Sequence, residues 1–259
     1  MIGVFDSGMG GLTAVKEIFE IMPDAGLIFF GDTGRVPYGT RSRETIINYA
    51  LQDARFLASK KVDAILVACG TVSSTAMPEL KKALDVPVLG VVEATSEAAV
   101  KATRNGKIGI IGTPATINSG SYVDFISKTA PELETFCTAC PLFVPLVEEG
   151  FSSADCEITR LTVEHYLADI REKGIDTLIL GCTHYPVMGE AIARAMPGVT
   201  LINSGAESAR RLHEMGLLKP GGGAHYYVSD STEHFTRLAS RFLGRALSGS
   251  VEYVEIDKY

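Results

Sequence analysis

The sequence predicts an α/β protein with two pseudo-symmetric α/β domains, each with a mainly parallel central sheet flanked by helices and with an active site in the cleft between them. Short apolar runs alternate with segments of helical periodicity from end to end, the pattern of parallel strands joined by crossover helices. The apolar runs close on Gly, Asp or Cys, and part of the pattern occurs twice. Together these three observations indicate the fold class.

Seven apolar runs before residue 206 are expected to be strands, in two sets. The first set is 2–8, 27–32, 64–70 and 86–92, and the second is 107–113, 176–182 and 199–205. A helix should precede the strand at 176–182, because apolar residues between 163 and 170 follow helical spacing and Gly174 offers a C-cap.

The end of the chain is expected to return to the first half. After residue 205 the pattern predicts a helix, a Gly-rich loop at 219–223, a strand at 224–229, a helix at 231–244 and a last strand at 251–256. The predicted domains are therefore 1–96 plus 207–259, which is discontinuous, and 97–206.

The two halves also share sequence. The segment DAILVACGTVSSTAMPEL at 63–80 resembles DTLILGCTHYPVMGEAI at 176–192 in its Asp, apolar run, Cys and Thr. At the same spacing, VPVLGVVEA at 86–94 aligns with VTLINSGAE at 199–207. An internal repeat of this kind predicts two halves related by an approximate twofold axis and facing each other.

Composition and charge exclude several classes of protein. The chain has 259 residues, 46% of them hydrophobic, which is ample for a large core. A net charge of -7 with scattered basic residues argues against binding to nucleic acid or to a membrane surface. No apolar run reaches the roughly 18 to 20 residues of a membrane span, and no signal-peptide pattern follows Met1, so we expect a cytoplasmic protein. The five Cys, an odd number, are expected to be reduced thiols.

Two thiols stand at matching places in the repeat. Cys69 and Cys182 each follow a strand, at the sheet edge where open parallel sheets bind ligands. If the halves face each other, so do these thiols. A thiol titrates near pH 8.5, so one thiolate can remove a proton from a carbon while the other thiol delivers one to its opposite face. The pair therefore predicts inversion of a carbon centre.

Polar neighbours suit this chemistry, because a carbanion beside a carboxylate needs positioned donors. Gly70, Thr71 and Ser73 follow one thiol, and Thr183 and His184 follow the other. His184 is either a structural imidazole or the proton partner of Cys182. Asp6, at the end of the first strand, either caps the next helix or relays a proton to Cys69.

Two other motifs resemble metal-binding and dinucleotide-binding motifs but lack their full patterns. The CTAC segment at 137–140 has C-x-x-C spacing but no second pair or His cluster to complete a metal site, so we expect incidental thiols and no metal. The glycines of DSGMGG at 6–11 lack dinucleotide-binding spacing, so this loop is interpreted as an anion-binding turn.

Six segments together resemble bacterial glutamate racemases, of the cofactor-independent aspartate/glutamate racemase superfamily, over essentially the whole chain. They are GVFDSGMGGLT near the start, GDTGRVPYG at 31–39, VACGT at 67–71, GTPATINSGSY at 112–122, PLVEEG at 145–150 and LGCTHYP at 180–186. The His after Cys-Thr resembles the glutamate branch, since aspartate racemases typically have Glu there.

The resemblance implies that glutamate binds between the two domains without pyridoxal phosphate, metal or any other cofactor. Cys69 would take the α-proton of D-glutamate and Cys182 that of L-glutamate. Asp6 would support Cys69, and His184 with Glu148 would support Cys182, although Glu149 is adjacent to Glu148. Substrate contacts would come from Ser7, Pro37, Tyr38, Gly39, Gly70, Thr71, Thr116 and Thr183. A homodimer and a supply of D-glutamate for peptidoglycan are also implied.

Gly70 departs from the family pattern, which usually has Asn after the first Cys. The missing amide would leave a substrate group without a partner, at a cost of about 1 to 3 kcal/mol. We therefore expect Gly70→Asn to tighten glutamate binding.

Two alternatives stay open at this point. One is a racemase or isomerase for another small acid, such as aspartate or a hydantoin. The other is a two-domain protein that closes on an amino acid without turnover. Paired thiols favour catalysis, because binding alone gains nothing from two titratable groups.

Overall fold

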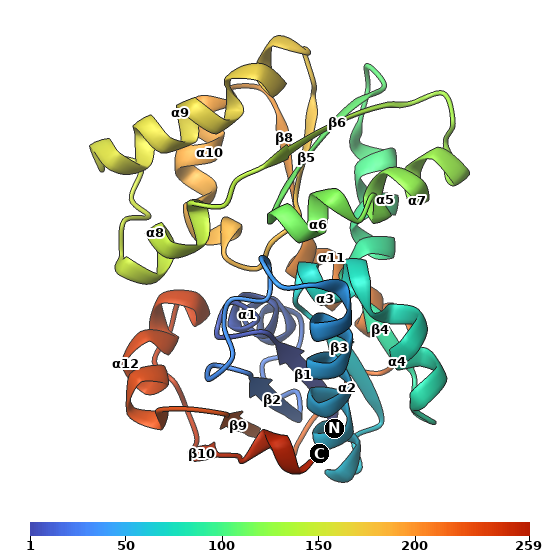
Figure 1. Cartoon of the computed structure of the whole chain (residues 1–259), viewed down its shortest axis with the longest axis vertical. Helices are drawn as coiled ribbons and strands as arrows, with labels where there is room; N and C mark the ends of the chain where they lie inside the picture. Colours follow the sequence, from blue (N-terminus) through green and yellow to red (C-terminus); the bar gives the residue numbers. More distant parts are fainter.

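The computed structural model describes all 259 residues and contains two sheets of parallel strands, one above the other in Figure 1. The strands are β1 Ile2–Asp6, β2 Leu27–Gly31, β3 Ala64–Val67, β4 Val88–Gly90, β5 Lys107–Gly112, β6 Glu134–Ala139, β7 Thr177–Leu180, β8 Thr200–Asn203, β9 Ala224–Val228 and β10 Val251–Tyr253. The six-stranded sheet has the order β10-β9-β2-β1-β3-β4 and the four-stranded sheet β6-β5-β7-β8. Every pairing within the sheets is parallel, so the predicted fold class is confirmed.

Helices flank both sheets. They are α1 Leu12–Ile21, α2 Arg43–Ser59, α3 Gly70–Thr75, α4 Met77–Ala83, α5 Val91–Ala102, α6 Pro114–Asn118, α7 Ser121–Thr129, α8 Phe143–Glu149, α9 Glu157–Glu172, α10 Gly189–Ala195, α11 Ser204–Glu214 and α12 Thr232–Leu243, with short 3-10 turns at Tyr185–Met188 and Ile256–Lys258. The expected helix before β7 is α9, and Gly174 follows it with a φ of 68°, the left-handed conformation of a C-cap glycine. None of the helices is both long and apolar enough to cross a membrane.

The second sheet repeats the strand order of the first. Its order β6-β5-β7-β8 matches the segment β2-β1-β3-β4 strand for strand. Strands β3 and β7 are therefore equivalent, and each pairs with the first strand of its own half in parallel register. The internal repeat seen in the sequence thus corresponds to a repeated sheet. We call the elements around the six-stranded sheet the first half and those around the four-stranded sheet the second half.

Several predicted strand ends were wrong, because helices begin sooner than the apolar runs end. Val91 and Val92 open α5, Gly70 opens α3 and Ser204 opens α11. At the last of these, the Asn203 side chain accepts hydrogen bonds from the amides of Gly205 and Ala206, which starts the helix there.

Strand β6 was missed altogether. It lies at the edge of the second sheet, and its residues are exposed or half-buried. An edge strand with polar side chains lacks the continuous apolar run by which the central strands were found. The CTAC segment straddles its end, with Cys137 exposed in the strand and Cys140 buried just beyond it.

The last strands join the first sheet, as predicted: β9 pairs with β2, and β10 pairs with β9. The predicted boundaries at 96/97 and 206/207 fall inside α5 and α11, which pack against each other. The domain division itself stays a prediction. One apolar cluster runs through both halves, from Val4 and Leu12 in the first to Leu178 and Tyr185 in the second.

Candidate active site

The two thiols lie where the halves meet. Cys69 follows β3 as the N-cap residue of α3, and Cys182 follows β7. Their residues are only 4% and 7% exposed. A Cβ built on Gly70 would lie 2.1 Å from the carbonyl oxygen of Gly181 and 3.7 Å from Cα of Cys182. The main chain beside one thiol therefore touches the main chain beside the other.

Tyr122 of α7 is a second marker of this proximity. Burial raises the pKa of its hydroxyl, and negative charge on either Cys182 or Cys69 raises it further. Charges on both sulfur atoms therefore affect the same side chain.

Cys69 has an environment that favours the protonated thiol. Burial raises its pKa to about 12, with a further contribution from the negative charge of Asp6. Its Sγ lies 3.3 Å from Oγ of Ser7, which acts in the opposite direction. In this enclosed state Cys69 therefore holds its proton at neutral pH.

Cys182 has a different partner, His184. Burial lowers the pKa of His184, but hydrogen bonds to Cys182 and Glu148 outweigh it and raise the pKa to about 10. Nε2 of His184 lies 3.0 Å from Oε1 of Glu148. The imidazole is therefore protonated at neutral pH and stands between a thiol and a carboxylate.

Of the two adjacent glutamates, Glu148 is the one that meets His184, while Glu149 is exposed. Arg241 of α12 helps to hold this end of α8, because its Nη1 donates to the carbonyls of Val147 at 2.9 Å and Glu148 at 2.6 Å. Arg241 was not among the predicted site residues. Its separation from α8 in the sequence offered no local signal.

Asp6 is fully buried at the end of β1. Its Oδ2 accepts from the amide of Gly8 at 3.0 Å, and its Oδ1 accepts from the Thr183 hydroxyl at 3.3 Å. Burial raises its pKa, while the positive charge of His184 lowers it. The amide of Gly11, the N-cap residue of α1, also lowers the pKa of Asp6. Both sequence interpretations are therefore compatible with its position, as a cap and as an acid beside Cys69.

The glycine-rich loop after β1 allows close approach between the halves. A Cβ on Gly10 would lie 2.4 Å from both the Thr183 hydroxyl and Nδ1 of His184. Next to it, the Thr13 hydroxyl donates to the carbonyl of Thr183 at 2.9 Å. The loop thus packs directly against the segment that follows Cys182.

A row of hydroxyls joins α3 to α6. Oγ1 of Thr71 lies 2.9 Å from Oγ1 of Thr113, which lies 3.0 Å from Oγ1 of Thr116. Thr113 was missed in the sequence, although its place directly after a buried strand is the signal that singled out the cysteines. Ser73 was expected beside Cys69, but its hydroxyl donates to the carbonyl of Val67 and accepts from the amide of Val91 instead. Its role is structural.

The segment 37–39 reaches the site through its main chain. The Tyr38 side chain is buried in the first half, where its hydroxyl donates to Asp32 and, at 3.1 Å, to Asp53. In contrast, the carbonyl of Gly39 accepts from the amide of Ala115 in the second half at 3.2 Å. Any contact of Tyr38 with a ligand would therefore use backbone atoms. Pro37 precedes it in the same loop.

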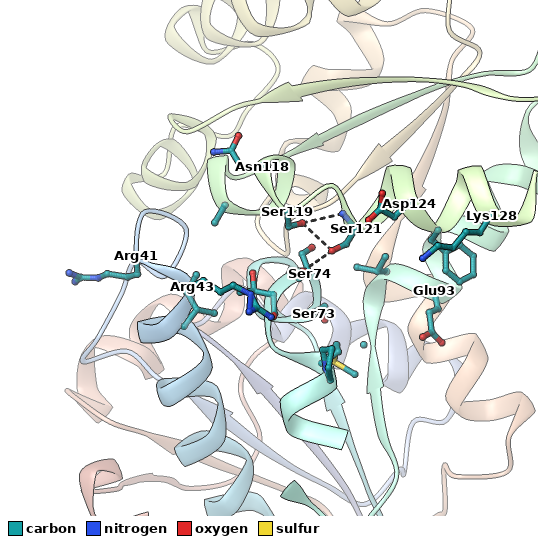
Figure 2. Close-up of a pocket in the computed structure, with 18 residues that line it drawn as sticks. Arg41, Arg43, Ser73, Ser74, Glu93, Asn118, Ser119, Ser121, Asp124 and Lys128 are labelled. Carbon is teal, nitrogen blue, oxygen red and sulfur yellow. Dashed lines mark hydrogen bonds between the residues drawn. The ribbon is translucent and has the colours of Figure 1, made fainter. Parts of the chain in front are cut away.

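The thiols do not line any of the five principal cavities of the molecule. The largest, of about 780 Å³, lies between the halves farther along α3, with Arg41, Arg43 and Lys128 among its lining residues (Figure 2). There the Ser121 hydroxyl donates to the carbonyl of Ser74 at 2.7 Å, across the two halves (Figure 2). Both thiols are nearly buried in this structure, with 4% and 7% of Cys69 and Cys182 exposed.

This geometry also bears on Gly70→Asn. A side chain at position 70 would run into the Gly181 carbonyl, which is main chain and cannot swing aside. The substitution would therefore need a main-chain shift here, and its expected effect on glutamate binding stays a prediction.

Two buried thiols thus follow equivalent strands, with an imidazole and carboxylates nearby, an arrangement suited to proton transfer. The family model for Asp/Glu/Hydantoin racemase matches residues 12–212. The chain belongs to this family, and an amino-acid racemase is the class of enzyme that the match defines.

Several individual relatives are glutamate racemases. A glutamate racemase of Geobacter metallireducens is 45% identical, covering 99% of this chain and 97% of the relative, and one of Persephonella marina is 46% identical, covering 99% and 98%. The crystal structure of a Francisella tularensis glutamate racemase in complex with D-glutamate matches with a TM-score of 0.91 at 39% identity, covering 100% of this chain and 98% of that one. A Picrophilus torridus aspartate racemase, at 19% identity and a TM-score of 0.60, shares the fold.

Proposed function

We propose that the protein interconverts L-glutamate and D-glutamate with Cys69 and Cys182 as its two acid–base groups. The observation that carries the proposal is the contact between Gly70 and Gly181, which brings together the chain beside two thiols at equivalent strand ends. The similarity to glutamate racemases, one of them in complex with D-glutamate, supports the choice of substrate.

The proposed reaction has two proton transfers. One sulfur, as thiolate, takes the α-hydrogen as a proton, and the electron pair of the broken C–H bond stays on the carbon and its carboxylate. The other thiol then gives its proton to the opposite face and becomes a thiolate. Cys182 acts on L-glutamate and Cys69 on D-glutamate, so one turnover moves the proton between sulfurs.

The surroundings of the thiols support different roles for their partners. His184 has a pKa of about 10 and can hold or move a proton beside Cys182, while Glu148 orients it. Asp6 lies near Cys69 and bonds to Thr183, so it is a proton relay or an orienting group between the two sides.

The substrate needs donors for its carboxylates, because charge develops on the α-carboxylate in the carbanion. The hydroxyls of Ser7, Thr71, Thr116 and Thr183 and the main chain of Gly39 are the proposed donors. Enclosure supports the proposal as well, since excluded water strengthens these interactions and protects the carbanion. Gly70 contributes no side chain to this set.

The decisive experiment follows the α-proton. L-Glutamate is incubated with the protein in heavy water, and deuterium incorporation and the D-isomer are measured by NMR and chiral chromatography. Cys69→Ser and Cys182→Ser should each slow racemisation by about 10²- to 10⁴-fold. Cys137→Ser, which removes an exposed thiol in β6, is the control and should leave the rate unchanged.

Unchanged racemisation in either site variant would remove that thiol from the mechanism. Binding of glutamate without deuterium incorporation by the unaltered protein would instead support the ligand-binding alternative. Running the same assay with aspartate distinguishes the remaining racemase alternative.

Three broader proposals accompany the activity. D-Glutamate production supports a role in peptidoglycan synthesis, which the relatives' shared activity favours. Five free cysteines suit the reducing cytoplasm. A homodimer is the proposed assembly, and light scattering at micromolar concentration tests it.

A further inference from the structure

The main chain of the second half leaves no room for a side chain at Gly70. An added Cβ would lie 2.1 Å from the oxygen and 3.1 Å from the carbon of the Gly181 carbonyl. Both atoms belong to the main chain directly before Cys182, so no rotamer change can make room. In the closed arrangement, position 70 therefore accepts glycine alone.

Two hydrogen bonds near Gly70 also join the two halves. On one side Thr71 meets Thr113 at 2.9 Å. On another, the Thr13 hydroxyl donates to the carbonyl of Thr183 at 2.9 Å. A side chain at position 70 would wedge the halves apart and stretch these hydrogen bonds together.

We propose that Gly70 is a positioning residue that sets how closely the two halves, and with them Cys69 and Cys182, approach each other. Gly70 stands where the resembling family usually has Asn. The proposal rests on the two-thiol function, because the distance between the sulfurs matters only if both exchange protons with one carbon.

The size of the expected effect follows from the geometry. A carbon atom needs about 3.3 Å from a carbonyl oxygen, so a methyl group at position 70 must separate the halves locally by about 1 Å. A misplacement of about 1 Å at a catalytic centre can cost roughly 10²-fold in rate. Proton transfer is sensitive in this way because both sulfurs must reach the same carbon.

The test compares Gly70→Ala with Gly189→Ala. Gly189 is also the first residue of a short helix after a catalytic strand, but a Cβ there meets nothing within 4 Å. For each variant we measure kcat and KM in both directions, and the rates at which iodoacetamide alkylates Cys69 and Cys182, resolved by peptide mass spectrometry. Circular dichroism monitors the fold.

For Gly70→Ala we expect kcat to fall about 10²-fold in both directions with a smaller change in KM. Both thiols should be alkylated at least about fivefold faster than in the unaltered protein, because the enclosed site opens. Gly189→Ala should match the unaltered protein in every measurement. G70N should behave like Gly70→Ala or more severely.

The proposal is overturned if Gly70→Ala keeps kcat within twofold and alkylation rates unchanged, or if G70N raises kcat/KM. Loss of the folded circular dichroism spectrum in Gly70→Ala would also contradict it, since halves that can separate should accept a methyl group without unfolding. These outcomes are distinguishable from failure of the two-thiol function, which would show as full racemisation by Cys69→Ser or Cys182→Ser, or as no deuterium incorporation by the unaltered protein.

Discussion

Replacing Glu148 with Gln should lower the basicity of His184 and slow the enzyme. The carboxylate is the charged partner of the imidazole at 3.0 Å, and its side chain is 37% exposed while that of His184 is 8% exposed. Gln keeps the size of the side chain and a carbonyl oxygen, but it removes the negative charge. The substitution therefore isolates the electrostatic contribution.

The magnitude is limited by the exposure of Glu148. Solvent screens such a pair, so its contribution to stability should be about 1 kcal/mol or less. In a protein of this size that corresponds to a decrease of about 2 to 4 °C in Tm. The contribution is present below the ordinary pKa of His, 6.5, and is lost as the pH rises through about 10. The Tm difference should therefore be largest near pH 6.5 and shrink as the pH rises toward 10.

The pH dependence of kcat/KM should show the same decrease in the basicity of His184. The alkaline limb of the kcat/KM profile, which reflects loss of the His184 proton near pH 10, should move to lower pH in Glu148→Gln. Since the two enantiomers have equal free energy in water, kcat/KM must fall by one factor in both directions. The His184 ring signals give a direct titration by NMR.

Glu149→Gln is the matched control, because Glu149 is the exposed neighbour and makes no bond to His184. It should leave the His184 titration and the pH profile unchanged. An equal shift in both variants, or none in Glu148→Gln, would refute the reasoning, since the effect would then not depend on the 3.0 Å contact.

Two further predictions concern stability. Tyr38→Phe removes the donor shared by the buried carboxylates of Asp32 and Asp53, so urea unfolding should show a loss of about 1 to 3 kcal/mol, while KM changes less than twofold because the hydroxyl is directed at these two carboxylates. A KM increase above tenfold would contradict that orientation. Burial raises the pKa of Asp176, but hydrogen bonds led by that from Thr103 outweigh it and lower the pKa to about 2. This carboxylate stabilises the fold above its ordinary pKa of 3.8 and loses the effect as the pH falls toward 2. Asp176→Asn should thus be less stable at pH 7, and a difference that persisted unchanged to pH 3 would count against this account.

Local patterns in the sequence were sufficient for the fold class, and they singled out the two thiols as candidates. A parallel strand covered by helices on both faces must be apolar along its length, as β1, β3 and β7 are, and such runs are visible without knowledge of their partners. The repeat then predicted equivalent strands, and the strand orders agree. Cys69 and Cys182 stood out because each follows such a run. The edge strand β6 was not predicted, because it has no continuous apolar run.

Only the tertiary structure decided which residues meet across the halves. The choice of Glu148 over Glu149 follows from how α8 packs beside the segment after β7. The support from Arg241 and the contact of Gly70 with Gly181 both depend on how the two sheets are oriented toward each other. Each contact joins residues far apart in the chain, and a change of about 1 Å in closure would make or break it. Periodicity describes one element at a time, so it carries no information on that orientation, which is set by the packing of side chains between the halves.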